Sequence, residues 1–510
     1  MAVDVLWFKK DLRVQDHQPL LEAAKSDNKL FCLFLVEPSR LELEDTDHIH
    51  IDWELDNAEE LEKSLRKIGS NLHIKFENVV TAMQNIHDEY GISRILSHQE
   101  TGNSWSFDRD IQVKEWCNLN DVQWLEFPNN GVIRGLTDRD LWKKKRDSRM
   151  RVVLEEPPNL SNKSIPLSNV FDRTSIGLNP RKLSLRPKPG EIAAATRLGE
   201  FLEHEAKNFQ WGISSPVNAV KFGSGLSPYL TVGAISMRRV VQTTNDRMNK
   251  IRTNPNIVDD ARMWLKSLAS FRKRLAWRCH FIQKLEMESD LDLVAQNKII
   301  DSNLKRVMDE EKFMKWKNGT TGWPFLDACM RQLTNTGWIN FRMRAMIMSA
   351  ASYNLWLPWR EAGCHLAKQF IDYEPGIHWS QVGMQSGTTG INTIRAYSMT
   401  KQGKDQDPEG DYIRKWIPEL AMVPTKYIHE PWEMPIELQE NVSCLIGTHY
   451  PAPIVDEVAS RKEGIKRSYA ARSSQESRVQ SKLVLQKHGS RTRPRKRKPK
   501  KDKTLQQKLF

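Results

Sequence analysis

The sequence predicts an α/β domain with a parallel sheet, followed by a large all-α domain. Short apolar runs at residues 3–8, 30–36 and 94–97 are bounded by charged residues, as expected of buried strands. A helical pattern at residues 53–67 lies between two of these runs, and such alternation favours a parallel sheet covered by helices. From about residue 193 to 435, apolar residues recur at helical spacing and strand signals disappear.

The predicted helix at 53–67 owes its pattern to apolar residues at Trp53, Leu55, Ala58, Leu61 and Leu65. Residues 123–127 are expected to complete the sheet. The segment after the first predicted strand reads Lys-Lys-Asp-Leu-Arg, without the glycine-rich loop that cradles a dinucleotide phosphate. The sheet is therefore not expected to be an ordinary dinucleotide site.

Four regions follow from these patterns. Residues 1–130 form the α/β domain, and residues 131–192, rich in Pro, Ser, Asn and basic residues, form a connector over the surface. Residues 193–440 form the helical domain. Residues 441–510 are predicted to be a basic, disordered tail, because the chain becomes polar after residue 451.

Composition limits the class of protein. Hydrophobic residues make up 39% and charged residues 28% of the 510 residues, which is typical of a globular chain. No apolar run reaches 18 residues and no signal peptide is visible, so no membrane partner is expected. Six scattered cysteines without C-x-x-C spacing indicate reduced thiols in the cytoplasm and no metal site. We expect a cytoplasmic monomer, or a nuclear one if the host is eukaryotic.

The formal net charge of +13 indicates an anionic partner. Eight Lys and Arg residues lie between Arg491 and Lys501, with no acidic residue among them. This segment can add sequence-independent affinity for DNA by counterion release, or it can serve as a solubilising tail. The sequence leaves both alternatives open.

Residues 370–397 hold the densest mixture of acids, small residues and aromatics. Such a mixture suits the wall of a pocket for a large polar ligand, and an ordered polar loop is the alternative. The turn at 223–230 opens a predicted helix, where it can hold phosphate or simply supply a Ser N-cap. Arg342 and Arg344 can pair with phosphate or with nearby acids, or form a solvated basic face.

Several further motifs occur in an order that resembles one family. They are Trp-Phe-Lys-Lys-Asp-Leu-Arg at 7–13, Gly-Trp-Pro at 322–324, Asp327, Met-Arg-Gln-Leu at 330–333, Asp-Gln-Asp-Pro-Glu-Gly at 405–410, Ile-Arg-Lys-Trp at 413–416, Pro-Glu-Leu at 418–420 and His-Glu-Pro-Trp at 429–432. Over about residues 1–435 the chain resembles the photolyase/cryptochrome flavoproteins. This resemblance implies an antenna-type α/β domain and an all-α FAD-binding domain that holds FAD in a U shape.

The resemblance also implies roles for single residues. FAD contacts fall on Trp211, Ser224, Leu226, Ser227, Phe271, Arg344, Asp372, Glu374 and His378. DNA contacts fall on Arg274, Trp277, Arg278, Arg342 and Gln402, and the catalytic positions are Trp277, Trp359 and His378. A second antenna chromophore, folate or deazaflavin, is a further expectation, and Glu100 lies near the corresponding region.

Three departures from the family pattern bear on mechanism. His378 stands where Asn, Asp or Cys is usual opposite flavin N5, so it can stabilise an anionic flavin, supply a proton, or act as a neutral donor. Val382 and Arg306 replace two of three tryptophans that reduce the flavin, leaving Trp359; Trp379, Trp356 and Trp338 are alternatives. Arg274 replaces the Glu that usually holds a thymine dimer.

The first functional hypothesis is a photolyase. Reduced FAD absorbs light, donates an electron to a pyrimidine dimer in damaged DNA, and takes it back after the dimer splits, while the protein supplies positioning. A lyase for a (6-4) product is the variant in which His378 matters more. The alternative is a cryptochrome-type blue-light photoreceptor that signals through FAD redox state. A third class is a redox-inert flavoprotein that binds DNA or RNA.

Overall fold

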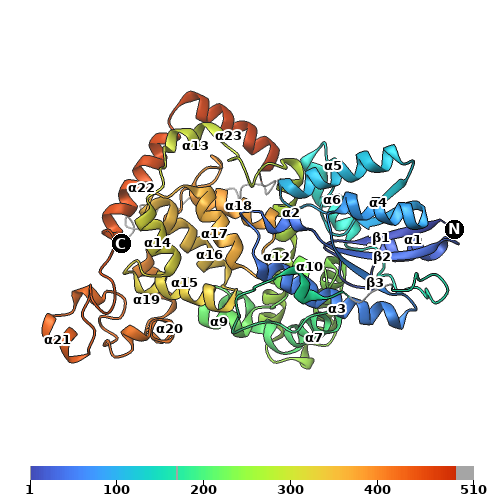
Figure 1. Cartoon of the computed structure of the whole chain (residues 1–510). Helices are drawn as coiled ribbons and strands as arrows, with labels where there is room; N and C mark the ends of the chain where they lie inside the picture. Colours follow the sequence, from blue (N-terminus) through green and yellow to red (C-terminus); the bar gives the residue numbers. More distant parts are fainter. Residues whose placement is uncertain (1, 168–170, 490–510) are drawn as a thin grey trace, which may run out of the picture.

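A computed structural model of the chain describes residues 2–167 and 171–489. The α/β part and the helical part lie side by side (Figure 1). The five strands are parallel in the order β3-β2-β1-β4-β5, with bounds β1 (Val3–Phe8), β2 (Lys29–Val36), β3 (Leu72–Phe76), β4 (Ile92–His98) and β5 (Gln123–Phe127). The predicted fold class is confirmed.

Helices cover the sheet through short connections. They are α1 (Gln18–Lys25), α2 (Pro38–Leu41), α3 (His48–Lys67), α4 (Val79–Tyr90) and α5 (Ser104–Leu119). Helix α3 begins before the predicted helix because Asp47 caps it and His50 completes a capping box. Strand β3 was missed because the prediction followed continuous apolar runs, whereas Leu-His-Ile-Lys-Phe at the edge of the sheet alternates apolar and polar residues.

The connector 131–192 is more than a surface loop. It contains α6 (Trp142–Arg149), and Leu30 of β2 exchanges backbone hydrogen bonds with Lys163 and Ile165. Leu160 and Leu183 are buried. The connector thus covers part of the α/β core.

The helical part contains most of the remaining helices. They are α7 (Glu191–Glu200), α8 (Phe209–Gly212), α9 (Pro216–Phe222), α10 (Ser227–Val232), α11 (Met237–Thr253), α12 (Ala261–Met287), α13 (Lys298–Leu304), α14 (Glu310–Asn318), α15 (Pro324–Thr336), α16 (Phe341–Ser349), α17 (Trp359–Gln369), α18 (Pro375–Ser386), α19 (Met399–Gln406), α20 (Asp411–Trp416) and α21 (Ile436–Asn441). A π-helical turn, η6 (Ala350–Asn354), extends α16.

The C-terminal region departs from expectation. Predicted disorder after residue 451 is wrong for α22 (Glu457–Ala471) and α23 (Gln475–His488), which lie along α13 at the edge of the helical part (Figure 1). Their buried faces carry small residues such as Gly464, Ser468 and Ser477. Small side chains permit close packing without an apolar pattern, so composition alone suggested disorder. The basic segment from Arg491 to Lys501 lies outside the described residues.

One hydrophobic core spans both parts of the molecule. Leu6 and Phe8 of β1 belong to the same buried cluster as Leu226, Tyr229 and Phe271 of the helical part. The indole N–H of Trp53 in α3 donates to Pro228 O at 3.1 Å. No helix in the described ranges is both long and apolar enough to cross a membrane.

Candidate functional site

Helix α10 begins at the predicted phosphate-binding turn. Gly225 has φ +63°, a conformation that favours glycine, and Leu226 is buried while Ser224 and Ser227 are partly exposed. At the other end of α10, the Thr231 hydroxyl donates to Asp372 O at 3.3 Å. The turn and residue 372 are therefore held close together by one short helix.

Arg344 and Asp372 form an ion pair, one of the alternatives that the sequence left open. Arg344 Nη2 donates to Asp372 Oδ2 at 3.0 Å, and its guanidinium lies 4.0 Å from the centroid of the Phe370 ring. Asp372 is buried, and its Oδ1 lies 2.9 Å from the same Arg344 Nη2, without hydrogen-bond geometry among the described residues. A carboxylate that is held by one guanidinium keeps further acceptor capacity, which fits a ligand that brings its own N–H or O–H group.

Arg278 and Glu374 form a second pair. Arg278 Nη2 donates to Glu374 Oε2 at 2.5 Å and to Leu230 O at 2.9 Å. Burial raises the pKa of Glu374, and the Arg278 charge opposes that shift. Arg278 points inward toward α10, so the structure does not place it with the predicted DNA-contacting residues.

His378 lies in an aromatic setting beside the Arg344–Asp372 pair. Its ring centroid is 5.0 Å from that of Trp379, 5.3 Å from that of Tyr373 and 6.0 Å from that of Phe370. His378 Nε2 lies 2.9 Å from Gly363 O, and a carbonyl can only accept, so Nε2 carries the proton. Burial lowers the pKa of His378 to about 4. The imidazole is neutral at pH 7, which favours the neutral-donor alternative over the charged one.

Trp359 is buried at the start of α17, next to Trp379 of α18. The two ring centroids are 6.0 Å apart and the planes are nearly perpendicular. Arg306 has no aromatic ring that could pass an electron to this pair. Its guanidinium instead lies 4.8 Å from the centroid of the Trp356 ring. Of the alternative tryptophans named from the sequence, Trp379 is the one in ring contact with Trp359.

Four of the five predicted DNA-contacting residues lie near one another; Trp277 is exposed, Arg274 and Arg342 are partly buried, and Gln402 is buried. Trp277 is 48% exposed, and the Arg274 guanidinium carbon lies 4.6 Å from the centroid of the Trp277 ring. Arg274 also lies 5.7 Å from the Phe341 ring centroid. Arg342 Nη1 reaches Gln402 Oε1 at 3.5 Å. The positive charge of Arg342 lowers the pKa of Arg274, after the larger effect of burial.

Two predicted flavin contacts, Trp211 and Phe271, do not lie beside the Arg344–Asp372 pair. Trp211 is 50% exposed, with Lys266 Nζ 5.1 Å from its ring centroid. Phe271 is buried against Phe201 and Phe209, with centroid distances of 4.8 and 5.4 Å. The structure brings Arg344, Asp372, Glu374 and His378 together, whereas Trp211 stands at the surface.

A small pocket, open to solvent, lies between the two parts of the molecule. Its walls include Lys10, His50 and Glu100 from the α/β part, and Tyr373 and Glu374 from the helical part. Sequence reasoning missed this cavity, because its walls come from segments more than 250 residues apart in the chain and no local pattern marks them.

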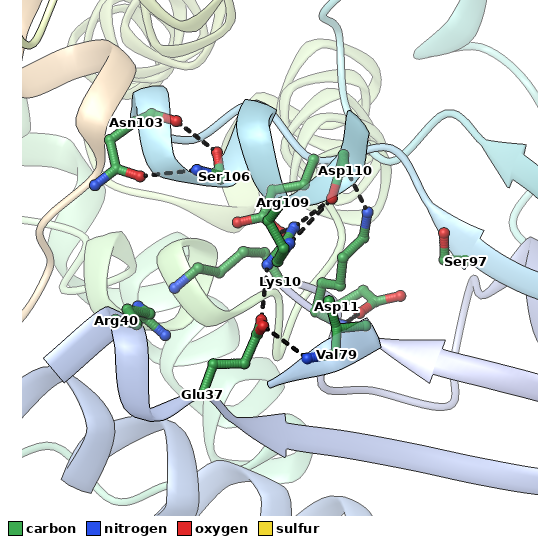
Figure 2. A network of polar contacts seen from close by, with 12 residues as sticks. Lys10, Asp11, Glu37, Arg40, Val79, Ser97, Asn103, Ser106, Arg109 and Asp110 are labelled. Atoms are coloured by element: carbon green, nitrogen blue, oxygen red, sulfur yellow. Dashed lines mark hydrogen bonds and ion pairs between the residues drawn. The ribbon is translucent and has the colours of Figure 1, made fainter. Parts of the chain in front are cut away.

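The carboxyl edge of the sheet carries a buried ion network centred on Arg109 (Figure 2). Arg109 Nη2 lies 2.7 Å from Asp110 Oδ1 and 2.8 Å from Glu100 Oε2, and Nη1 lies 3.5 Å from Glu37 Oε1. Lys9 Nζ reaches Asp110 Oδ2 at 3.3 Å. Glu100, expected near an antenna, is thus engaged by Arg109.

Asp11, His17 and His98 form a buried cluster of groups that are common metal ligands. His17 Nδ1 accepts the Leu20 N–H at 3.2 Å, so the proton of the neutral ring is on Nε2, which donates to Asp11 at 2.9 Å. Burial lowers the pKa of His98 to about 3. Neutral histidines that donate to an ionised Asp11 explain this cluster as a hydrogen-bond network. All six cysteines are buried and unpaired.

Fold and site together define a flavoprotein with an α/β part and a helical FAD-binding domain. A family profile described as the FAD binding domain of DNA photolyase matches residues 271–470, and one described as DNA photolyase matches residues 4–139. The chain belongs to the photolyase and cryptochrome family.

Relatives of both functional kinds are similar to the chain. The deoxyribodipyrimidine photo-lyase of Agrobacterium fabrum is 26% identical over 493 residues, covering 92% of this chain and 97% of that protein. Cryptochrome-2 of Arabidopsis thaliana is 28% identical over 493 residues, covering 89% of this chain and 76% of that protein. A solved archaeal photolyase from Sulfolobus tokodaii with two FAD molecules has a TM-score of 0.73 at 21% identity, covering 92% of this chain and 99% of that one.

Proposed function

We propose that the protein is a light-driven DNA repair enzyme that splits UV-induced pyrimidine dimers. The observation that carries the proposal is the opposite orientation of two adjacent residues in α12. Trp277 points outward and is 48% exposed, while Arg278 points inward to Glu374. One helical step thus connects a face suited to nucleic acid with the buried site suited to FAD.

In this proposal FAD is held by the Ser224, Leu226 and Ser227 turn and by the Arg344–Asp372 pair, with Glu374 and His378 nearby. When bound and reduced, FAD supplies the light-driven electron for repair. Arg344 offsets negative charge next to the cofactor, and the Asp372 carboxylate, which keeps acceptor capacity beside Arg344, accepts from a donor of the cofactor. The hydrogen bond from His378 Nε2 to Gly363 O holds the neutral imidazole ring in its orientation.

On the outer face, Trp277 stacks on a base that has been flipped out of the duplex. Arg274 and Arg342 contact backbone phosphates, and Gln402 is hydrogen-bonded to Arg342. These contacts require damaged DNA as the partner and no second copy of the chain. A monomeric state and a cytoplasmic location stay predictions, which size-exclusion chromatography and localisation of a tagged chain test.

The test is a repair assay. The purified protein, with its flavin chemically reduced, is illuminated with DNA that carries either cyclobutane dimers or (6-4) products, and lesions are counted. Trp277→Ala is expected to reduce lesion loss at least tenfold, or about 1.4 kcal/mol, because base–aromatic stacking contributes about 1–3 kcal/mol. Tyr469→Ala, which removes an aromatic side chain that is 56% exposed on α22, is the matched control. A flavin-loaded protein that leaves both lesions intact under light contradicts the repair proposal.

A cryptochrome-type photoreceptor is the second candidate. The observation that favours it is Arg274, which stands in place of a carboxylate and packs on the Trp277 ring. Glu374, a carboxylate on the inner side of the same helix, is engaged by Arg278. Light-dependent change of flavin redox state without any lesion loss supports this role.

A second, antenna chromophore is a further proposal for the same chain. The candidate places for it are the small pocket between the two parts and an adjoining pocket at the carboxyl edge of the sheet. Both pockets are lined by Lys10, Arg40, Glu54, Glu100 and Trp105. Extraction of non-covalently bound pigments from protein purified from its native host, followed by chromatography, tests whether folate, deazaflavin or another pigment accompanies FAD.

A further inference from the structure

An aromatic residue of the helical part is hydrogen-bonded to both an indole and a carboxylate. Trp379 Nε1–H donates to the Tyr373 hydroxyl oxygen at 2.9 Å, and the Tyr373 hydroxyl donates to Asp45 Oδ2 at 2.5 Å. Asp45 belongs to the α/β part and also accepts from Asn103 Nδ2 at 3.2 and 3.1 Å. The result is a continuous indole–phenol–carboxylate chain across the boundary between the two parts.

Trp379 occupies the space next to the missing tryptophan at position 382. Both residues lie on α18, one turn apart, and both face Gly363 of α17. A β-carbon on Gly363 would lie 2.6 Å from Trp379 Cζ3 and 3.3 Å from Val382 Cγ1. Trp379 is also in ring contact with His378 and Trp359, at 5.0 and 6.0 Å between centroids. An indole thus remains between the cofactor-side residue His378 and Trp359 despite Val382.

Position 306 carries Arg, so no aromatic side chain at that position can pass an electron to Trp359. Arg306 Nη2 donates to Ser386 O at 2.9 Å, and its guanidinium packs on one side of Trp356 while that of Arg467 packs 5.3 Å from the same ring. A guanidinium cannot be oxidised by an indole radical. Helix α22 seals this side, because the Gly464 backbone packs directly on Tyr353 O.

Tyr373, by contrast, borders solvent. It lines the cavity between the two parts, together with Lys10, His50 and Glu100. Its ring stacks on His50 at 5.5 Å between centroids. Burial, and next the charge of Asp45, raise the pKa of Tyr373 well above its usual value, so the phenol is protonated at rest. A small reductant in the cavity can therefore approach a phenol that holds its proton until it is oxidised.

We propose that Trp379 and Tyr373 form a one-electron path that reduces the photoexcited oxidised flavin, with Asp45 as the proton acceptor and the cavity between the two parts as the entry for the reductant. Trp379 gives one electron to the flavin and becomes an indole radical cation. Tyr373 returns an electron to Trp379 as its O–H bond breaks and the proton passes to Asp45. A thiol in the cavity then supplies one electron to the phenoxyl radical, which takes its proton back from Asp45, while the thiol becomes a thiyl radical and releases its own proton.

The carboxylate is what makes the phenol a useful member of the path. A phenol that loses an electron but keeps its proton becomes a strongly acidic cation, which is costly in a buried site. Transfer of the proton to Asp45 over a 2.5 Å hydrogen bond avoids that cation. Charge separation then lasts longer, because the return of the electron requires the proton to return as well.

The path rests on the proposed function only in requiring bound flavin, and its test needs no DNA. Protein with oxidised FAD is excited by a laser flash, and aromatic radicals are followed by transient absorption and by electron paramagnetic resonance after freezing. The wild type is expected to show a neutral tyrosyl radical. Tyr373→Phe is expected to lose that radical, shorten the life of the tryptophan radical at least tenfold, and slow steady flavin reduction by thiol at least tenfold.

Two further variants separate the electron from the proton. Asp45→Asn keeps the phenol but removes the base, so the tyrosyl radical yield and its solvent deuterium isotope effect are expected to collapse. Trp379→Phe is expected to abolish both radicals. The matched control is Tyr450→Phe, because the Tyr450 hydroxyl donates to Asp327 Oδ2 at 2.6 Å and no indole hydrogen bond to it is recorded among the described residues.

Flavin content and the dark absorption spectrum, measured for each variant, exclude loss of the cofactor as the cause. Wild-type radical kinetics in Tyr373→Phe that still binds flavin would overturn the path. A wild-type protein that forms the tyrosyl radical but repairs no lesion after chemical reduction would contradict the repair proposal. It would not contradict the electron path through Trp379 and Tyr373.

Discussion

At the scale of single residues, the site is organised by two ion pairs, Arg344–Asp372 and Arg278–Glu374, and the two partners of the first pair differ in solvent exposure. The Asp372 side chain is 3% exposed and the Arg344 side chain 24% exposed. A buried carboxylate needs its cation, because removal of one partner from a buried pair leaves an uncompensated charge that costs about 3–5 kcal/mol. The Arg344–Asp372 pair is therefore both a structural element and a polar wall for the cofactor.

Asp372→Asn is expected to weaken FAD binding about tenfold or more, which corresponds to about 1.4 kcal/mol. The amide cannot neutralise Arg344, and the acceptor Oδ1 is replaced or reoriented. The ratio of flavin absorbance to protein absorbance after gel filtration measures the loss. Asp407→Asn is the control, since Asp407 is a buried carboxylate that accepts the N–H groups of Tyr412 and Ile413 away from this pair. Full flavin occupancy of Asp372→Asn would contradict the assigned site.

The sequence could predict this pair but not every neighbour. A pairing of Arg344 with a nearby acid was one of the alternatives that the sequence left open, and the ion pair with Asp372 is observed. Arg278 follows Trp277 directly, and no pattern in the sequence tells which of two adjacent helical residues faces Glu374. Asp45 and Tyr373 are separated by 328 positions, so only the folded chain shows their hydrogen bond.

At the scale of elements, the C-terminal helices show how close packing can replace apolar burial. The buried residues of α22 include Gly464, Ser468 and Ala471, and the Ser468 hydroxyl donates to Gly464 O at 2.7 Å. A β-carbon on Gly464 would lie 2.1 Å from Tyr353 O, which belongs to the backbone of η6. Helix amphipathicity is the usual sequence signal of a packed helix, and this contact does without it.

Gly464→Ala is expected to release α22 from η6, because backbone cannot yield by that much without moving the helix. Overpacking of this kind costs about 1–3 kcal/mol. Faster hydrogen exchange and proteolysis within α22 and α23 measure the release. The matched control is Gly199→Ala in α7, where nothing lies within 4 Å of the added carbon, so the change is expected to be neutral or stabilising by about 0.5–1 kcal/mol. Unchanged protection of α22 in Gly464→Ala would contradict the packing described.

At the scale of the whole molecule, buried histidines couple stability to pH. Burial lowers the pKa of His50 and His378 to about 4, and of His98, His280 and His365 to about 3. Their pKa in the unfolded chain is about 6.5. Between these values the unfolded state binds more protons than the folded state, so the free energy of unfolding falls as the pH falls.

We expect full stability above about pH 7 and a progressive loss from about pH 6.5 toward pH 4, with each histidine contributing up to about 1.4 kcal/mol per pH unit. Denaturant midpoints at pH 7.5 and 5.0 measure it. His365→Phe is expected to shrink the difference, because the His365 Nε2 has no hydrogen-bond partner in the described structure and its ring packs against Trp316 at 5.5 Å between centroids. His204→Phe, at an exposed position, is expected to leave the difference unchanged.

The shared core of the two parts also has a consequence for how the chain is made. The α/β part is synthesised first. The acceptor of the Trp53 indole N–H, Pro228 O, is synthesised 175 residues later. At about 5–20 residues per second this interval lasts roughly 9 to 35 s. During that time the outer side of α3, which will join Leu226 and Tyr229 in one core, stays uncovered in the nascent chain. The protein is therefore expected to depend on chaperones during synthesis more than a chain whose N-terminal domain closes its own core.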